Sequence, residues 1–73
     1  MKESAAYRMI AGLRYIPGAG IRRTYGIKLS GTSKRIRDIS TKRERVRSLV
    51  DQLNQEQVSP AHFDAVVLDA LPL

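Results

Sequence analysis

Four basic residues lie close together in the sequence and are the side chains best suited to binding an anion: Lys42, Arg43, Arg45 and Arg47. They fall at the start of a predicted helix, where each cation opposes the helix dipole by about 0.3 to 1 kcal/mol. The free backbone amides of a helix start also attract anions. With Lys34, Arg35 and Arg37 just before them, these residues form a candidate phosphate or carboxylate site. The alternative is that they extend into solvent or pair with Glu44 and Asp38.

A second basic group lies on two predicted strands and consists of Arg8, Arg14, Arg22, Arg23 and Lys28. A basic sheet face can follow a nucleic-acid backbone, but base stacking on it also needs aromatic side chains. Tyr7, Tyr15 and Tyr25 fall on the predicted core face instead. The charge therefore fits an acidic protein surface as well as RNA or DNA.

Catalytic chemistry has few candidate residues. His62 is the only histidine, and one imidazole in a chain without cysteine cannot form a zinc site. Asp64 and Asp69 have no partner at helical spacing, and the glycines at 18 and 20 belong to a turn that does not lead into a helix. We therefore expect no enzyme, no catalytic residue, no cofactor and no bound metal.

The charge of the chain is unevenly distributed. Its 73 residues include thirteen Lys and Arg and seven Asp and Glu, a net charge of +6. Residues 1–50 hold all the bases and three acids, whereas residues 51–73 hold four acids and no base. The expected partners are therefore polyanions or acidic proteins, and the oppositely charged ends also allow self-association.

Composition favours one small cytoplasmic domain over residues 1–73. A chain of this size buries about 60% of its unfolded surface, which leaves little room for a deep enzymatic cleft. No apolar stretch approaches the roughly 20 residues that span a bilayer. The first apolar stretch is interrupted by Arg8 and Arg14, which is unlike a signal peptide.

Alternating apolar residues predict strands over 7–16 and 21–29, joined by the turn residues of 17–20. A second turn at 30–33 introduces a possible third strand over 34–39. If the Tyr and Leu positions face the core, the opposite face presents the following residues: Arg8, Ile10, Arg14, Ile16, Arg22, Thr24 and Lys28.

Helical spacing of Val46, Leu49, Val50 and Leu53 predicts a helix over 41–54. Ser40 or Thr41 is the expected N-cap, Thr41 and Glu44 have the spacing of a capping box, and Asn54 is the expected left-handed end.

A second helix is expected over 60–71, with Ser59 as its cap, Pro60 at its first position and Pro72 after its end. This helix carries Asp64 and Asp69 and no base, which disfavours its insertion into the major groove of DNA. The element order predicts an α+β fold: a two- to three-stranded antiparallel sheet followed by a helical hairpin packed on one face, the other face being open.

Several short motifs stand out in the chain: Tyr25-Gly26-Ile27, Asp38-Ile39-Ser40, Val46, Leu49-Val50, Leu53-Asn54, Ser59-Pro60, His62, Val66-Val67, Asp69 and Leu71. Together they resemble a family of small bacterial proteins of unknown function. The resemblance covers about two thirds of the chain and implies no catalytic or binding residue. The shared positions favour a common fold, with Gly26 at a tight position in its strand.

The sequence thus predicts a small basic, non-enzymatic binding or regulatory protein that engages an acidic protein partner or inhibits a larger nucleic-acid-handling complex. Alternatives are a nonspecific RNA- or DNA-binding module and a self-associating structural protein. The candidate binding residues are Arg8, Arg14, Arg22, Arg23, Lys28, Lys34, Arg35, Arg37, Lys42, Arg43, Arg45 and Arg47.

Overall fold

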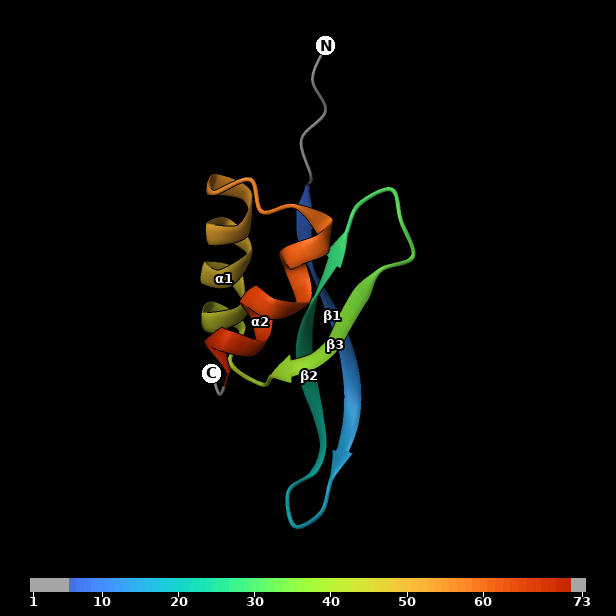
Figure 1. Ribbon diagram of the computed structural model, residues 1–73. Helices are drawn as coiled ribbons and strands as arrows, with labels where there is room; N and C mark the ends of the chain where they lie inside the picture. The colour runs from blue at the N-terminus through green and yellow to red at the C-terminus, as the bar shows by residue number, and fades with distance from the viewer. Residues whose placement is uncertain (1–5, 72–73) are drawn as a thin grey trace.

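The computed structural model describes residues 6–71 and shows an open three-stranded sheet followed by two helices (Figure 1). In chain order the elements are β1 (Tyr7–Ile16), β2 (Gly20–Leu29), β3 (Arg35–Ser40), α1 (Arg43–Gln55), the 3₁₀ turn η1 (Pro60–His62) and α2 (Phe63–Ala70). The predicted α+β fold is confirmed, and the uncertain third strand is present.

Both strand pairs are antiparallel, in the order β1-β2-β3. Tyr7 lies opposite Leu29 at one end of the first hairpin, and Ile16 lies opposite Gly20 at the other. The connecting turn closes through the Ala19 amide, which donates to the Ile16 carbonyl at 2.9 Å, and Gly20 supplies a φ of +84° that other residues rarely adopt. The glycine-rich segment is therefore the hairpin turn that the sequence predicts.

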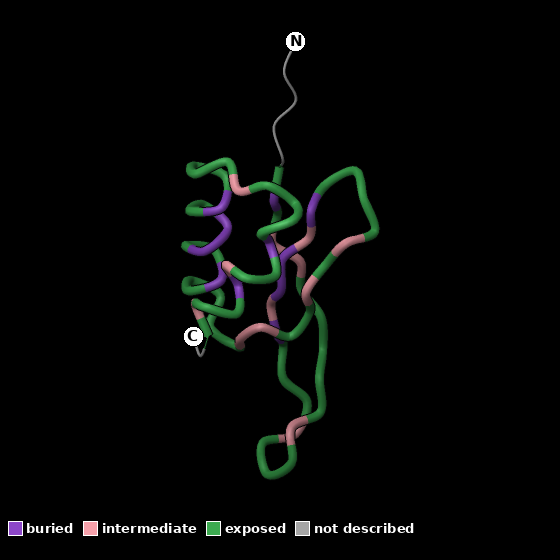
Figure 2. Tube along the Cα trace, in the orientation of Figure 1, coloured by how far each residue is buried: buried purple, intermediate pink, exposed green. Residues whose placement is uncertain are grey.

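The helices cover one face of the sheet and only part of its length. The buried core lies between the helices and this face of the sheet. It consists of Tyr7, Ile27, Leu29, Val46, Leu49, Val50, Leu53, Phe63 and Val67. Figure 2 shows these buried positions gathered between α1, α2 and the nearer half of the sheet. The opposite sheet face is open, as expected.

The far half of the β1–β2 hairpin extends beyond the helices, and residues 13–23 are here called the arm (Figures 1 and 2). The apolar side chains on its helix-facing side are exposed: Leu13 by 70%, Tyr15 by 68% and Ile21 by 66%. The expectation that Tyr15 joins the core is wrong. A ten-residue strand is about 33 Å long, whereas the thirteen residues of α1 extend only about 20 Å, so the helix layer ends before the strands do.

The backbone of a bulge in β3 packs closely against a glycine in β2. The pairing shifts register between Tyr25 and Ile27, and Asp38 has a positive φ of 54°. A Cβ on Gly26 would collide with the Ile36 carbonyl oxygen and lie 2.9 Å from Arg37 Cα. Gly26 is therefore required by the close approach of the β3 backbone, which confirms the expected tight position.

The ends of α1 differ from the predicted caps. Lys42 is the N-cap residue and makes no side-chain cap bond; its own amide donates to Ser40 Oγ at 3.0 Å. Thr41 and Glu44 therefore do not form a capping box. At the other end the positive φ of 49° belongs to Gln57, and Asn54 remains inside the helix.

Asn54 holds the first strand against the last turn of α1. Its Oδ1 accepts a hydrogen bond from the Tyr7 amide at 2.8 Å, and its Nδ2 donates to the Tyr7 carbonyl at 3.0 Å. The Tyr7 hydroxyl donates to the Val58 carbonyl at 2.6 Å, and its ring lies 4.9 Å from that of Phe63. Tyr7 thereby connects β1 to both helices.

The second helical segment is shorter than the predicted 60–71, because η1 occupies its first three residues and α2 begins at Phe63. The Ser59 carbonyl accepts the His62 amide at 2.9 Å, while its hydroxyl meets His62 Nδ1 at 2.8 Å rather than capping a backbone amide. Pro60 takes the first position of η1 as expected, and Pro72 lies outside the described residues.

Candidate partner-binding surfaces

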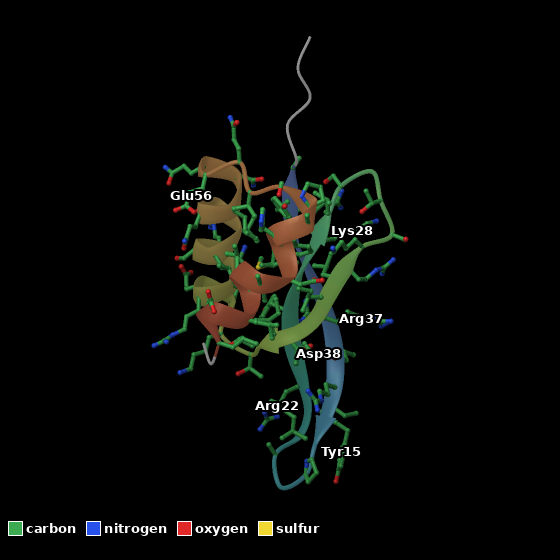
Figure 3. The ribbon with its side chains drawn as sticks, viewed as in Figure 1. Tyr15, Arg22, Lys28, Arg37, Asp38 and Glu56 are labelled. Carbon is green, nitrogen blue, oxygen red and sulfur yellow. The ribbon has the colours of Figure 1, made fainter. Side chains whose placement is uncertain are left out.

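Three basic residues form a row across the open face of the sheet. Arg8 of β1 lies opposite Lys28 of β2, and Lys28 lies opposite Arg35 of β3. Arg37 projects from β3 on the side away from the helices (Figure 3). We call Arg8, Lys28, Arg35 and Arg37 the open-face basic patch.

Like charges directly opposite each other weaken a sheet by about 0.2 to 1 kcal/mol per pair. None of the four patch residues has an ion-pair partner among residues 6–71, and the three arginines are exposed. Adjacent strands lie about 4.8 Å apart, so the row of three bases is about 10 Å wide. The patch therefore has the dimensions and charge to receive a small group of carboxylates or phosphates.

The open-face patch lacks an aromatic platform. By strand alternation Tyr7, Tyr15 and Tyr25 all lie on the helix-facing side of the sheet, and the apolar neighbour on the open side is the half-buried Ile10. Stacking of nucleic-acid bases on this face therefore has no support from the strand residues of the described chain.

The arm carries a second like-charge pair. Arg14 lies directly opposite Arg22, on the same strand faces as Arg8 and Lys28. Arg23 lies opposite Leu13 and thus on the helix-facing side, so the five residues of the second basic group do not share one face. A two-stranded ribbon also twists strongly along its length, which turns the arm relative to the three-stranded part.

The four bases at the start of α1 are exposed but belong to the helix layer: Lys42, Arg43, Arg45 and Arg47. Since α1 packs on the opposite side of the sheet from the open-face patch, the structure does not join them into one surface. Asp38, a candidate partner for these bases, instead accepts a hydrogen bond from the Thr24 hydroxyl. The twelve candidate residues therefore divide among the sheet, the arm, the β2–β3 turn and the helix layer.

Lys34 differs from the other bases because it has partners within the chain. Its Nζ lies 3.6 Å from Asp64 Oδ2 and donates to the Pro60 carbonyl at 3.1 Å. These contacts join the β2–β3 turn to the start of the second helical segment. Asp64 thus has a partner that helical spacing within its own segment could not indicate.

No group of three or more metal-ligating side chains occurs within the described part of the chain, residues 6–71. The one side-chain hydrogen bond of His62 within this part is with the Ser59 hydroxyl. No helix within it has the length and apolar character needed to cross a membrane.

A family model described as a family of unknown function (DUF6514) matches residues 2–72. The chain belongs to this family. No curated protein and no solved structure shows significant similarity to it. The match to DUF6514 includes the first hairpin, so it extends beyond residues 25–71, on which the sequence resemblance rests.

Three residues of the motifs quoted from the sequence have structural roles in this chain. Gly26 accommodates the β3 bulge, Asp38 binds Thr24 across it, and Asn54 holds β1. The open-face patch was missed as a distinct unit because its members are spread over residues 8–37, and only the strand register brings Arg8, Lys28 and Arg35 into one row.

Proposed function

We propose that this DUF6514 chain is a non-enzymatic, cytoplasmic binding protein of bacteria that engages an acidic protein through its open-face basic patch. The observation that supports the proposal is the cross-strand row of Arg8, Lys28 and Arg35. Three like charges side by side do not favour folding, so their placement is better explained by a ligand that neutralises them.

An acidic protein fits the patch better than a nucleic acid. The row is compact, about 10 Å across three strands, which matches a few carboxylates on a helix or loop. A nucleic-acid strand would favour aromatic side chains for its bases beside the basic residues, and the open face has none in the described strands. Inhibition of a larger nucleic-acid-handling complex would be one consequence of occupying an acidic surface on that complex.

The test compares two variants with the same loss of charge. In the first, Arg8, Lys28 and Arg35 are changed to Gln; in the matched control, Arg43, Arg45 and Arg47 are changed to Gln. Each protein is immobilised and used to capture proteins from the source cells at low and moderate salt. We expect wild type and the α1 control to retain the same acidic protein, and the open-face variant to lose it.

Two outcomes would contradict the proposal. Equal capture by both variants would remove the open-face patch from the interface. Tighter binding to single-stranded RNA or duplex DNA than to any protein, with a log–log salt slope of about 0.9 per phosphate for duplex DNA, would favour a nucleic-acid ligand instead. Circular dichroism of both variants checks that loss of capture does not reflect loss of folding.

A further inference from the structure

The outer edge of β1 carries backbone groups that have no partner within residues 6–71. β1 pairs with β2 alone, and the Ala6 carbonyl accepts the Ser30 amide on that side. The Tyr7 amide and carbonyl point the other way, toward Asn54. Because these directions alternate along a strand, the groups of Met9, Ala11, Leu13 and Tyr15 also point outward. Within residues 6–71 they form no hydrogen bond.

Both ends of this free edge are defined. Asn54 occupies the outward groups of Tyr7, and Pro17, which has no amide hydrogen, follows the last residue of β1. The free edge therefore covers residues 8–16, and Gly12 is its central residue. An exposed edge of this length is a template for another strand.

We propose that a second copy of this chain pairs antiparallel with the free β1 edge, about a two-fold axis at Gly12, and joins the two three-stranded sheets into one. This proposal does not depend on the open-face patch. Only an antiparallel arrangement centred on Gly12 lets two identical free edges overlap over their whole length. A strand from an unrelated protein would not be expected to match both ends of the free β1 edge.

Side-chain charges favour the same register. With Gly12 on the axis, Arg8 lies opposite Ile16 of the second copy, and Arg14 lies opposite Ile10 of the second copy. Moving one strand by two residues to place Ala11 on the axis would put Arg8 opposite Arg14 of the second copy, a like-charge pair. The centred register avoids that repulsion and retains the full overlap.

Apolar side chains on the helix-facing side also become paired. Leu13, 70% exposed in one copy, lies opposite Ala11 of the second copy, and Tyr15, 68% exposed, lies opposite Met9 of the second copy. Met9 is half-buried and packs against the core. The second copy therefore covers apolar surface that the helices of a single chain do not reach.

A cysteine introduced at Gly12 tests the axis directly, because the chain has no cysteine of its own. On the outer edge Gly12 and its counterpart form a non-hydrogen-bonded pair, with Cα atoms about 4.5 Å apart. That spacing permits a disulfide. The nearest atom to an added Cβ is Thr24 Oγ1 at 3.9 Å, so Gly12→Cys fits the single chain.

Arg14→Cys is the matched control. With Gly12 on the axis, position 14 of one copy and position 14 of the other lie four residues apart along the strands, about 13 Å. We expect mild oxidation to link Gly12→Cys into a covalent dimer at least tenfold faster than Arg14→Cys. Equal rates would indicate random collision, and faster linkage of Arg14→Cys would indicate another register; either result overturns the proposal.

The mass of the wild type supplies an independent measurement. By sedimentation equilibrium from micromolar to millimolar concentration, the mass should rise from 8.2 kDa toward twice that value. Ala11→Pro removes an outward amide hydrogen that no β1–β2 bond uses, so it should stay folded by circular dichroism and remain monomeric. A wild-type mass of 8.2 kDa at every concentration would exclude the pairing.

Discussion

At the residue scale, Gly26 determines how β3 crosses β2. The β3 backbone occupies the space that a Cβ would need, with Arg37 Cα 2.9 Å from that position. We predict that Gly26→Ala lowers the free energy of unfolding by about 3 kcal/mol, because the bulge must move. Gly12→Ala is the control: it meets nothing closer than 3.9 Å and should be neutral or slightly stabilising. Urea unfolding of both variants measures the difference, and equal stability would contradict this role for Gly26.

Tyr7 gives the stability a pH dependence. Burial raises the pKa of the Tyr7 phenol above its ordinary value of 10.0. The neutral phenol therefore stabilises the fold fully below pH 10, and this contribution is lost as the pH rises through the higher folded-state pKa. At pH 7, Tyr7→Phe should cost about 1 kcal/mol, because the Val58 carbonyl loses its donor.

Above pH 10 the difference between wild type and Tyr7→Phe should shrink. Tyr15→Phe, a change at an exposed ring, serves as the control for loss of a hydroxyl and should match wild type at pH 7. Unfolding in urea at several pH values provides the measurement. A constant difference between wild type and Tyr7→Phe would show that the Tyr7 phenol does not ionise on unfolding.

Local sequence signals predicted some residue roles and missed others. The φ values of Gly18 and Gly20 follow from the turn in which they lie, so a local pattern was sufficient. Asn54 is a residue type that often ends a helix, yet its side-chain amide binds the backbone of Tyr7, 47 residues away. Such a long-range contact has no local signature, and the same holds for the pair of Thr24 and Asp38.

At the element scale, alternation predicted the strands and their core-facing side but not how far the core extends. Tyr15 and Tyr7 occupy equivalent positions in the pattern, yet Tyr7 is 4% exposed and Tyr15 is 68% exposed. The difference arises because α1 rises about 1.5 Å per residue and a strand rises about 3.3 Å. Sequence periodicity contains no information on which half of a long strand a helix covers.

The arm should therefore be dispensable for folding. Replacing the arm, residues 13–23, by Asn-Gly would close the hairpin directly after the hydrogen-bonded Gly12–Thr24 pair with a favoured two-residue turn. At micromolar concentration we expect the free energy of unfolding to change by less than about 1 kcal/mol, since every removed residue lies outside the core. Thermal unfolding followed by circular dichroism measures this. A shortened chain that fails to fold would show that the arm supports the core.

At the scale of the whole molecule, excess positive charge should make stability depend on salt. The chain has a net charge of +6, and its described part has one ion pair, between Lys34 and Asp64. Raising the ionic strength to 1 M shortens the Debye length to about 3 Å and should stabilise the fold by screening repulsion.

Lys28→Gln removes the central base of the open-face row. It should raise stability at low salt by about 0.2 to 1 kcal/mol, and the gain should vanish at 1 M salt. Arg23→Gln removes the same charge opposite Leu13 and should have a smaller effect. Denaturant unfolding at two salt concentrations measures the stability of both variants. A stability gain of Lys28→Gln that persists in high salt would not be electrostatic.

The hydrogen bonds between Asn54 and Tyr7 also bear on the order of events during synthesis. β1 and β2 lie within the first 29 residues, so their hairpin can form while the rest of the chain is still being made. Asn54, which covers one end of the β1 edge, is translated only later, followed by α2. For that interval the nascent hairpin has neither its helical cover nor its edge protection, and ribosome-bound chains should be most prone to aggregate then.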